Sequence, residues 1–311
     1  MKICLIQTPS PFLLDEKVVP SLGILQVAAV LEEAGHEIVF LDFSGLDKDH
    51  MKMLLLAVSD QKIDTYAVTA TTPQFPSAVD ALGWIREIDP GKKVIIGGPH
   101  ATVAPTSCEM FDVVVAGDGE LAILDAIQPD APKVFDVSKV KDKGSLMWHW
   151  PSRHLIDFAS YHYSLNGKPA TSMMWSQGCP YGCLWCSGRL IPFYRRQRQR
   201  PIDDVVKETE HLLERYGMQG ITAYDDEVNI QNEALILLCN GLKPLSLKLR
   251  AFIKANLFND CQAEAMAEAG FVEICSGIES GSDRILGIMQ KQTTYDINLR
   301  ARNIAKKHGI R

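Results

Sequence analysis

The sequence predicts an α/β protein with two sheet domains, a doubly wound parallel sheet over residues 1–130 and part of an α/β barrel over residues 171–311. Three observations favour this class. In both halves, short apolar runs alternate with amphipathic stretches of helical periodicity. Between them, residues 131–170 lose this alternation and become rich in Pro and polar residues. Near-continuous apolar strands separated by helices are typical of parallel sheets that are covered on both faces.

The first domain begins with a strand and continues in regular alternation. Five strands are expected over residues 2–7, 37–43, 66–72, 94–98 and 113–116. Four helices are expected over residues 21–34, 49–61, 76–88 and 120–127. The first of these helices has apolar residues such as Leu22 and Leu25 on one side, and Gly35 ends it. Five strands with this spacing indicate a Rossmann-like, or flavodoxin-like, parallel sheet.

Such sheets bind ligands beyond the carboxyl ends of their strands. In this chain two of those ends carry the segments Gly97-Gly98-Pro99-His100 and Gly117-Asp118-Gly119. Segments rich in Gly permit close approach of the backbone to a ligand. The first strand is not followed by Gly-x-Gly-x-x-Gly, so a dinucleotide is the less expected ligand.

Residues 131–170 are expected to form a linker, because Pro132, Pro151 and the polar stretch 138–145 interrupt any periodic pattern. A second alternation begins at Thr171. Strands are expected over residues 173–176, 220–224, 248–253 and 271–275, and helices over residues 202–216, 232–242, 260–269 and 296–308. This order is compatible with an open or closed α/β barrel. The last residues, 309–311, are expected to form the turn into a further strand.

The composition excludes several classes of protein. The 311 residues are 46% hydrophobic and 23% charged, which is typical of a soluble globular protein and excludes disorder and collagen-like fibres. The net charge of −6 argues against a general binder of nucleic acid or of anionic membranes. The N-terminus lacks a secretory signal, and no apolar run reaches the ~20 residues that span a bilayer. We therefore expect a cytoplasmic protein.

Three of the eight cysteines, Cys179, Cys183 and Cys186, lie within eight residues of one another. These spacings let three sulfurs converge from one loop around a metal centre, and thiolates are the ligands of iron–sulfur clusters. Gly178 and Gly182 supply the tight backbone that such a loop requires. Structural zinc needs four ligands, and no further Cys or His lies within ten residues on either side. A zinc loop and three unrelated thiols remain as alternatives.

The pattern Cys-x-x-x-Cys-x-x-Cys, with Trp185 just before the last Cys, resembles the cluster loop of the radical S-adenosylmethionine (SAM) superfamily. The resemblance implies a [4Fe–4S] cluster whose open iron binds the amino and carboxylate groups of SAM. It also implies reductive cleavage of SAM to methionine and a 5′-deoxyadenosyl radical. Radical SAM proteins form a partial barrel, in agreement with the expected second domain.

Two downstream segments match the same family. Tyr224-Asp225-Asp226-Glu227 is similar to acidic segments that contact the methionyl amino group, and carboxylates suit an ammonium partner. The segment 277–283 resembles the Gly-x-Glu-Ser-Gly stretch that helps to hold SAM. The residues thereby implied in cofactor binding are Trp185, Tyr224, Asp225, Asp226, Glu279 and Ser280. A solvated acidic turn and a plain Gly/Ser turn are the alternatives.

A Rossmann-like domain ahead of a radical SAM domain resembles the cobalamin (B12)-binding subfamily. The matching segments are residues 20–23, 97–102 and 117–120, although the family usually has Glu where Asp118 stands. The resemblance implies cobalamin contacts from Gly97, Gly98, His100, Gly117 and Gly119. The Asp-x-His-x-x-Gly pattern that supplies an imidazole to cobalt is absent. A degenerate domain that binds nothing is the alternative.

Together these resemblances imply a cobalamin-dependent radical SAM enzyme, of the type that methylates a substrate carbon. A radical cyclisation or rearrangement enzyme is one alternative. A non-catalytic cofactor-binding or regulatory module is another, because the chain holds about four of the six strand–helix units usual in this family and is expected to be truncated before the last barrel strands. The expected partners are a small-molecule substrate and an electron donor such as flavodoxin or ferredoxin, with no membrane and no nucleic acid.

Overall fold

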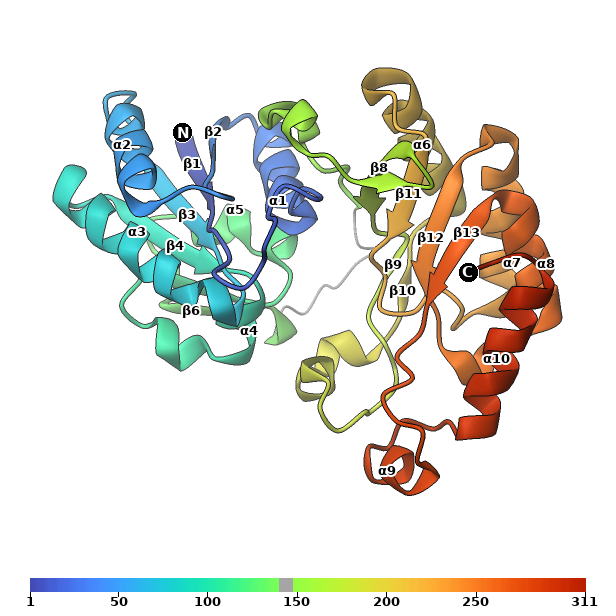
Figure 1. Ribbon diagram of the computed structural model, residues 1–311. Helices are drawn as coiled ribbons and strands as arrows, with labels where there is room; N and C mark the ends of the chain where they lie inside the picture. The colour runs from blue at the N-terminus through green and yellow to red at the C-terminus, as the bar shows by residue number, and fades with distance from the viewer. Residues whose placement is uncertain (140–147) are drawn as a thin grey trace. The chain divides into compact units, whose positions relative to one another are not determined.

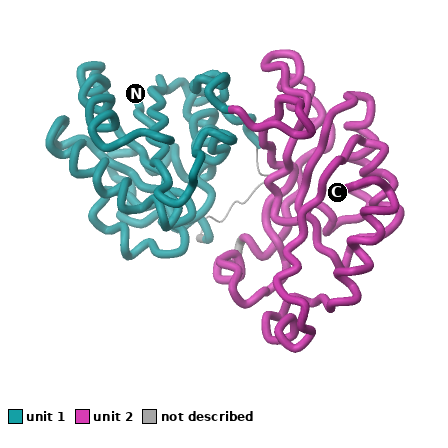
Figure 2. The backbone as a smooth tube through the Cα atoms, in the orientation of Figure 1, with its two compact units in different colours: residues 1–161 teal, residues 162–311 magenta. Residues whose placement is uncertain are grey.

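The computed structural model describes residues 1–139 and 148–311, which form two compact units, Met1–Tyr161 and His162–Arg311 (Figure 2). Each unit has its own sheet and its own hydrophobic core. The division between the units falls inside the expected linker. Residues 140–147 of that expected linker lie outside the described residues.

Six parallel strands form the sheet of the first unit, in the order β2-β1-β3-β4-β5-β6 (Figure 1). Their bounds are β1 Lys2–Gln7, β2 Glu37–Asp42, β3 Thr65–Thr69, β4 Lys93–Gly97, β5 Val113–Ala116 and β6 Val134–Asp136. The order of the first five strands is the flavodoxin-like one, so the expected fold is confirmed. The sixth strand lies within the segment expected to be linker, because three residues are too few to show a period.

Helices cover both faces of this sheet. They are α1 Leu22–Glu33, α2 Lys48–Ser59, α3 Phe75–Ile88, α4 Pro99–Val103 and α5 Ile123–Ala126. Alternate residues of β1 enter opposite cores, since Cys4 packs with α2 and α3 while Ile3 packs with α1 and α5. The helix expected over residues 120–127 is instead a 3₁₀ turn, Gly119–Leu121, followed by the short α5. This unit is therefore doubly wound, and its ligand edge lies at the carboxyl ends of the strands.

The second unit contains a curled sheet of five strands in the order β13-β12-β11-β8-β7 (Figure 1). Their bounds are β7 Ser164–Leu165, β8 Lys168–Met173, β11 Gly220–Ala223, β12 Lys248–Phe252 and β13 Phe271–Cys275. One face packs on the helices α6 Ile202–Tyr216, α7 Asn232–Leu242, α8 Asp260–Ala269 and α10 Tyr295–Lys307. The expected partial barrel is confirmed.

The first strand of this sheet begins earlier than expected. A hairpin joins β7 to β8 through Asn166 and Gly167, both of which have positive φ (49° and 72°). An Asn-Gly pair with this geometry is a favoured two-residue hairpin turn. At the other end of the sequence, the backbone of Arg311 bonds to Val272 and Ile274 of β13 at 3.1 and 2.9 Å. This pairing agrees with the expected turn into a strand.

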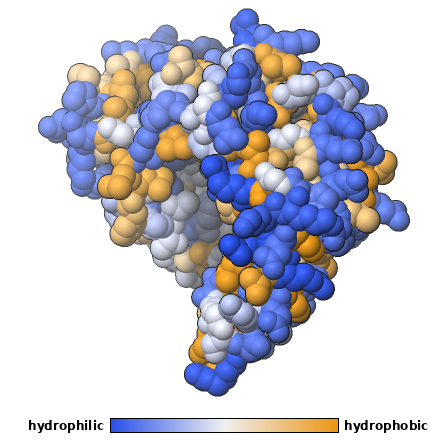
Figure 3. Space-filling view, turned by 45° about the vertical axis from the view of Figure 1, so that its right-hand side comes forward, coloured by the Kyte–Doolittle hydropathy of each residue, from blue (hydrophilic) through white to orange (hydrophobic). Residues whose placement is uncertain are grey.

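In the described part of the chain, none of the helices has the length and apolar character needed to cross a membrane. On the face shown in Figure 3, hydrophobic side chains form separate groups among hydrophilic ones. Scattered exposed hydrophobic residues of this kind are ordinary for folded proteins.

Candidate cluster and cofactor sites

The cysteine loop leaves the carboxyl end of β8 through the short strand β9 Ser176–Gln177, which pairs with β10 Arg198–Gln199. Gly178 opens the loop with φ +87°, and a Cβ at this position would overlap the carbonyl oxygen of Arg196. The next residue, Cys179, donates its backbone N–H to the carbonyl of Tyr194 at 2.8 Å. Glycine is therefore required at the entry to the loop, as the sequence suggested.

All three clustered cysteines are free thiols. Cys183 and Cys186 lie in one turn, closed by a 3.1 Å hydrogen bond from the Cys186 N–H to the Cys183 carbonyl. Burial raises the pKa of the Cys179 thiol to about 11. Burial thus favours the protonated thiol. A bound metal ion favours the thiolate instead, because coordination removes the thiol proton.

Three thiols on one loop are the type of donor that iron–sulfur clusters use. Among the described residues, no group of three or more His, Cys, Asp or Glu side chains is arranged to hold one metal ion. The ligands of zinc must meet at one atom about 2.3 Å from each sulfur. The thiolates of a [4Fe–4S] cluster bind different irons and can stand farther apart. The assignment of Cys179, Cys183 and Cys186 as its ligands stays a prediction.

The acidic segment after β11 contacts the strand and loop that lead to the cysteines. Asp225 is buried, and its two oxygens accept the Trp175 N–H at 2.7 Å and the Ser176 hydroxyl at 2.6 Å. Its burial raises its pKa to about 7. Asp226 accepts the Gly178 N–H at 2.9 Å. These two carboxylates thus position the loop, and their expected contacts with SAM stay a prediction.

Glu227 is the acidic residue whose oxygen is left without a partner. Its Oε2 is buried and accepts no hydrogen bond within the described parts of the chain. Burial raises its pKa to about 7, against the opposing effect of the Lys254 and Lys291 charges. A carboxylate oxygen in this state fits the amino group of SAM. Glu227 was not among the residues predicted to bind SAM, because sequence periodicity does not reveal which of three consecutive acidic residues has no partner.

The segment after β13 reaches the cysteine loop. The Leu184 N–H donates to the Met289 carbonyl at 3.0 Å, and Lys291 pairs with Glu279 at 3.1 Å. Glu279 has a positive φ of 61°, which is strained for a residue with a side chain. A Cβ at Gly277 would lie 2.5 Å from its carboxylate. The short helix α9 Asp283–Ile288, which the periodicity did not predict, makes this return possible.

The remaining residues expected to contact SAM lie nearer to solvent. Trp185, inside the cysteine loop, is 50% exposed, and Tyr224, at the end of β11, is 45% exposed. The hydroxyl of Ser280 accepts the backbone N–H of Ser282 at 3.1 Å, within the turn that precedes α9. Large exposed aromatic faces at this edge of the sheet remain available to a ligand.

In the first unit, the expected glycines lie at the carboxyl ends of β4 and β5. Gly98 has φ +90°, and a Cβ there would lie 2.5 Å from Thr69 Oγ1. The adjacent Gly97 is less constrained, since its nearest neighbour would be Val115 Cβ at 3.8 Å. Gly117 has φ +122° and donates its N–H to the Thr102 hydroxyl at 3.1 Å.

His100 is buried with both ring nitrogens engaged. Nδ1 lies 3.1 Å from Thr72 Oγ1 and Nε2 lies 2.9 Å from Ser107 Oγ. The ring packs 4.1 Å from that of Phe75, and burial lowers the pKa of the imidazole. In this arrangement neither nitrogen offers a lone pair to cobalt, which agrees with the missing Asp-x-His-x-x-Gly pattern. His100 therefore holds the loop between β4 and β5.

Gln7, the last residue of β1, carries a buried acceptor at this edge of the sheet. Its Nε2 donates to the Thr8 carbonyl at 3.0 Å, but its buried Oε1 has no partner among the described residues. β1 lies where the strand order reverses, which is the usual ligand position in such sheets. An unpaired acceptor there fits the carboxamide groups that rim a corrinoid. Gln7 was not predicted as a ligand residue, because it only ends an apolar run in the sequence.

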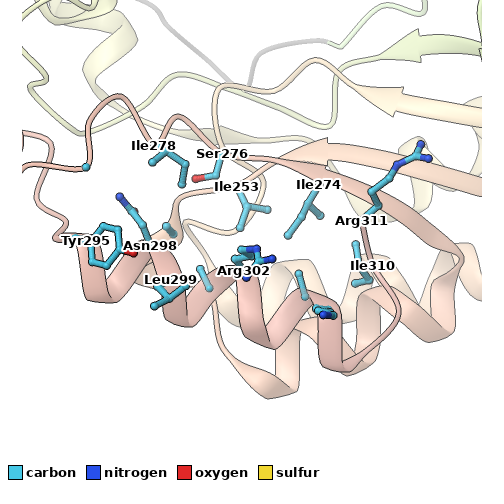
Figure 4. A pocket seen from close by; sticks show the side chains of 15 residues that line it. Ile253, Ile274, Ser276, Ile278, Tyr295, Asn298, Leu299, Arg302, Ile310 and Arg311 are labelled. Carbon is cyan, nitrogen blue, oxygen red and sulfur yellow. The ribbon is translucent and has the colours of Figure 1, made fainter.

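A cavity of about 720 Å³ in the second unit is lined in part by Ile278 and Gly281, which flank Glu279 and Ser280 in the sequence (Figure 4). It is formed by α10, the ends of β12 and β13, and the C-terminal residues, and its walls are mostly apolar. Ile253 and Ile274 point into it from the sheet, and Leu299 and Arg302 from α10 (Figure 4). None of the expected cofactor residues lines this cavity.

Comparison with known proteins gives the same division of the chain. Residues 15–127 match the B12 binding domain and residues 173–311 match the radical SAM superfamily. An uncharacterized methyltransferase of Pyrococcus horikoshii is 29% identical over all of this chain and 72% of its own length. An anaerobic magnesium-protoporphyrin IX monomethyl ester cyclase of Rubrivivax gelatinosus is 23% identical over 94% of this chain and 57% of its own.

Two solved structures share the fold. The radical SAM methyltransferase TsrM of Kitasatospora setae has a TM-score of 0.76 at 16% identity, over 99% of this chain and 66% of its own. The cobalamin-dependent radical SAM enzyme OxsB has a TM-score of 0.75 at 16% identity, over 99% of this chain and 48% of its own. The chain thus spans about half to three quarters of the proteins it resembles. It belongs to the family of radical SAM proteins with an N-terminal B12-binding domain, whose cofactors are cobalamin, SAM and a [4Fe–4S] cluster.

Proposed function

We propose that this protein is a cobalamin-dependent radical SAM enzyme that transfers a methyl group to a carbon atom of a small-molecule substrate. The observation that carries the proposal is the pairing, in one unit, of three free thiols on a single loop with the unpartnered carboxylate of Glu227. The B12-binding unit and the methyltransferase named among the relatives support methylation.

In this proposal the residues of the second unit bind and orient. Cys179, Cys183 and Cys186 hold the cluster, and Asp226 fixes the start of their loop through Gly178. Glu227 receives the amino group of SAM. When bound, the cluster and SAM supply the one-electron cleavage that generates a carbon radical, and cobalamin supplies a transferable methyl group.

The residues of the first unit hold the corrinoid by its edge. Gln7 Oε1 accepts a hydrogen bond from a carboxamide, and the backbone at Gly98 allows close approach. His100 stays bound to Thr72 and Ser107, so its own imidazole would not be a ligand of cobalt.

A radical cyclisation is the second candidate, because a cyclase stands among the relatives. The test uses the iron-reconstituted, cobalamin-loaded protein, reduced in the presence of SAM and candidate substrates. Methylation requires both 5′-deoxyadenosine and S-adenosylhomocysteine, whereas cyclisation produces 5′-deoxyadenosine without S-adenosylhomocysteine. If neither compound forms although cluster and corrinoid are bound, the chain is a non-catalytic binding module and the proposal fails.

We infer the cellular setting from the chemistry of the site. A cluster held by partly exposed thiolates persists in a reducing compartment, so the cytoplasm is the proposed location. The electron that reduces the cluster would come from a small redox protein such as flavodoxin or ferredoxin. A pull-down of reduced flavodoxin on the cluster-loaded protein, with the cluster-free protein as control, tests this partner.

A further inference from the structure

Lys254 is a buried cation beside the cysteine loop. It follows the carboxyl end of β12 and is only 3% exposed. Its Nζ lies 4.0 Å from the ring centroid of Tyr181, a geometry typical of a cation–π contact. Tyr181 lies within the loop, between Cys179 and Cys183. The ammonium of Lys254 therefore contacts the segment between Cys179 and Cys183, two of the predicted cluster ligands.

The backbone of Lys254 is fixed by a single amide side chain. Asn229 accepts the Lys254 N–H at 2.8 Å and donates to the Lys254 carbonyl at 3.1 Å. The ammonium itself donates to the Lys291 carbonyl at 3.1 Å. Lys254 thus connects three segments, the end of β11, the cysteine loop and the segment that carries Glu279.

The charge of Lys254 lacks a close counter-ion. Within the described ranges, no carboxylate lies within 4.0 Å of its Nζ. An ammonium withdrawn from water is costly unless an anion compensates it. The Lys254 charge lowers the pKa of Cys179 and that of Glu227, both of which burial raises, so both groups are within its electrostatic reach.

We propose that Lys254 is a positioning residue that holds the cluster loop through Tyr181 and makes the bound cluster easier to reduce. This inference rests on the proposed function, because it requires a cluster on the three thiols. A [4Fe–4S] cluster with three thiolates is an anion, and reduction adds one further negative charge. A fixed cation nearby stabilises the reduced state more than the oxidised state, since Coulomb attraction grows with charge.

The test measures the reduction potential of the cluster in the iron-reconstituted full chain, without SAM and without substrate. In an EPR-monitored redox titration, Lys254→Met should lower the ratio of reduced to oxidised cluster at a fixed potential by about threefold or more, where tenfold corresponds to ~59 mV for one electron. Lys254→Arg keeps the positive charge and should give the wild-type ratio of reduced to oxidised cluster. The matched control is Lys243→Met, which removes an exposed lysine paired with Glu268 near the amino end of β12.

A second measurement tests the contact with Tyr181 separately. Tyr181→Leu removes the aromatic face, whereas Tyr181→Phe keeps it. We expect a chelator to remove iron about threefold faster from Tyr181→Leu than from wild type, and at the wild-type rate from Tyr181→Phe. Equal rates of iron loss from the two variants would contradict a role of the Tyr181–Lys254 contact in holding the loop.

The two proposals fail in different ways. A wild-type titration curve from Lys254→Met, with the cluster fully assembled, would overturn the role of Lys254 and leave the proposed function intact. A wild-type protein that assembles no cluster would overturn the proposed function itself.

Discussion

The backbone N–H of Gly178 donates a 2.9 Å hydrogen bond to the carboxylate of Asp226. This bond ties the end of β11 to the first residue of the cysteine loop, immediately before Cys179. The neighbouring Asp225 holds Trp175 and Ser176 in the same way. The acidic segment thus acts first on the backbone that presents the thiols.

We therefore expect Asp226→Ala to loosen the loop. Leaving the Gly178 N–H without its acceptor should cost about 1–3 kcal/mol locally. The iron retained per chain after anaerobic gel filtration should fall at least about twofold. Asp226→Asn keeps an oxygen acceptor and serves as the control, with iron content near wild type. Full iron retention in Asp226→Ala would contradict this role.

Asp225 should give the protein a distinct pH dependence. Its pKa is raised from 3.8 to about 7, so the folded state keeps a proton that the unfolded state releases between these values. The contribution of Asp225 to stability should therefore fall as pH rises from about 4 to 7 and stay level above, by at most about 4 kcal/mol at 1.36 kcal/mol per pKa unit.

The measurement is urea unfolding of the cluster-free protein across this pH range. Asp225→Asn has no proton to lose, so its free energy of unfolding relative to wild type should increase between pH 4 and pH 7. Its amide can still accept the Trp175 N–H and face the Ser176 hydroxyl. A constant difference between the two proteins across the range would show that Asp225 does not titrate there.

Much of the fold could be predicted because long apolar strands and amphipathic helices carry strong periodic signals. β6 and β7 were not predicted, because three residues and two residues are too few to show a periodic pattern. The hairpin at Asn166 and Gly167 does have a sequence signal, because Asn-Gly is a favoured two-residue turn. In these cases pairing with a neighbouring strand, rather than local pattern, decides the structure.

The candidate site was predictable only where spacing itself carries the chemistry. The positions of Cys179, Cys183 and Cys186 are close in sequence, so their loop could be recognised directly. Glu227 and Gln7 could not be selected, because an unpaired oxygen is defined by contacts between distant segments. The same holds for His100, whose partners Thr72 and Ser107 come from two different loops.

His100 should be required for stability and dispensable as a cobalt ligand. His100→Ala removes two hydrogen bonds and a packed ring, so the free energy of unfolding should fall by about 2–4 kcal/mol. Because burial lowers its pKa, the stability that His100 contributes should be lost as pH falls from about 6.5 through the lowered folded value, so the wild type and His100→Ala should differ less at low pH. Urea unfolding of both proteins at pH 5.5 and 7.5 measures this.

A spectroscopic measurement completes the test of His100. The EPR spectrum of bound cob(II)alamin in the wild type should lack the splitting that an axial nitrogen from the protein produces. The spectrum of any cobalamin bound to His100→Asn should be the same. Axial nitrogen splitting that disappears in His100→Asn would contradict the account.

Gly97 and Gly98, which lie shortly before His100, have different surroundings, so the same substitution should have different effects at the two positions. Gly98→Ala should destabilise the first unit by about 1–3 kcal/mol, since Gly98 has φ +90° and its Cβ would crowd Thr69. Gly97→Ala adds the same methyl group in ordinary contact with Val115 and should be nearly neutral. Cobalamin retention should follow the same order. Equal stability and retention in the two variants would show that this turn is not constrained.

The most direct test of the central claim is the iron and acid-labile sulfide content of the anaerobically reconstituted chain, with EPR after reduction. The account predicts about four irons and four sulfides per chain and a reduced-cluster signal that changes when SAM is added. Cys179→Ala, Cys183→Ala and Cys186→Ala should each lose the cluster, whereas Cys261→Ala, on the exposed side of α8, should retain it. Bound zinc, no metal, or an intact cluster in these three cysteine variants would contradict it.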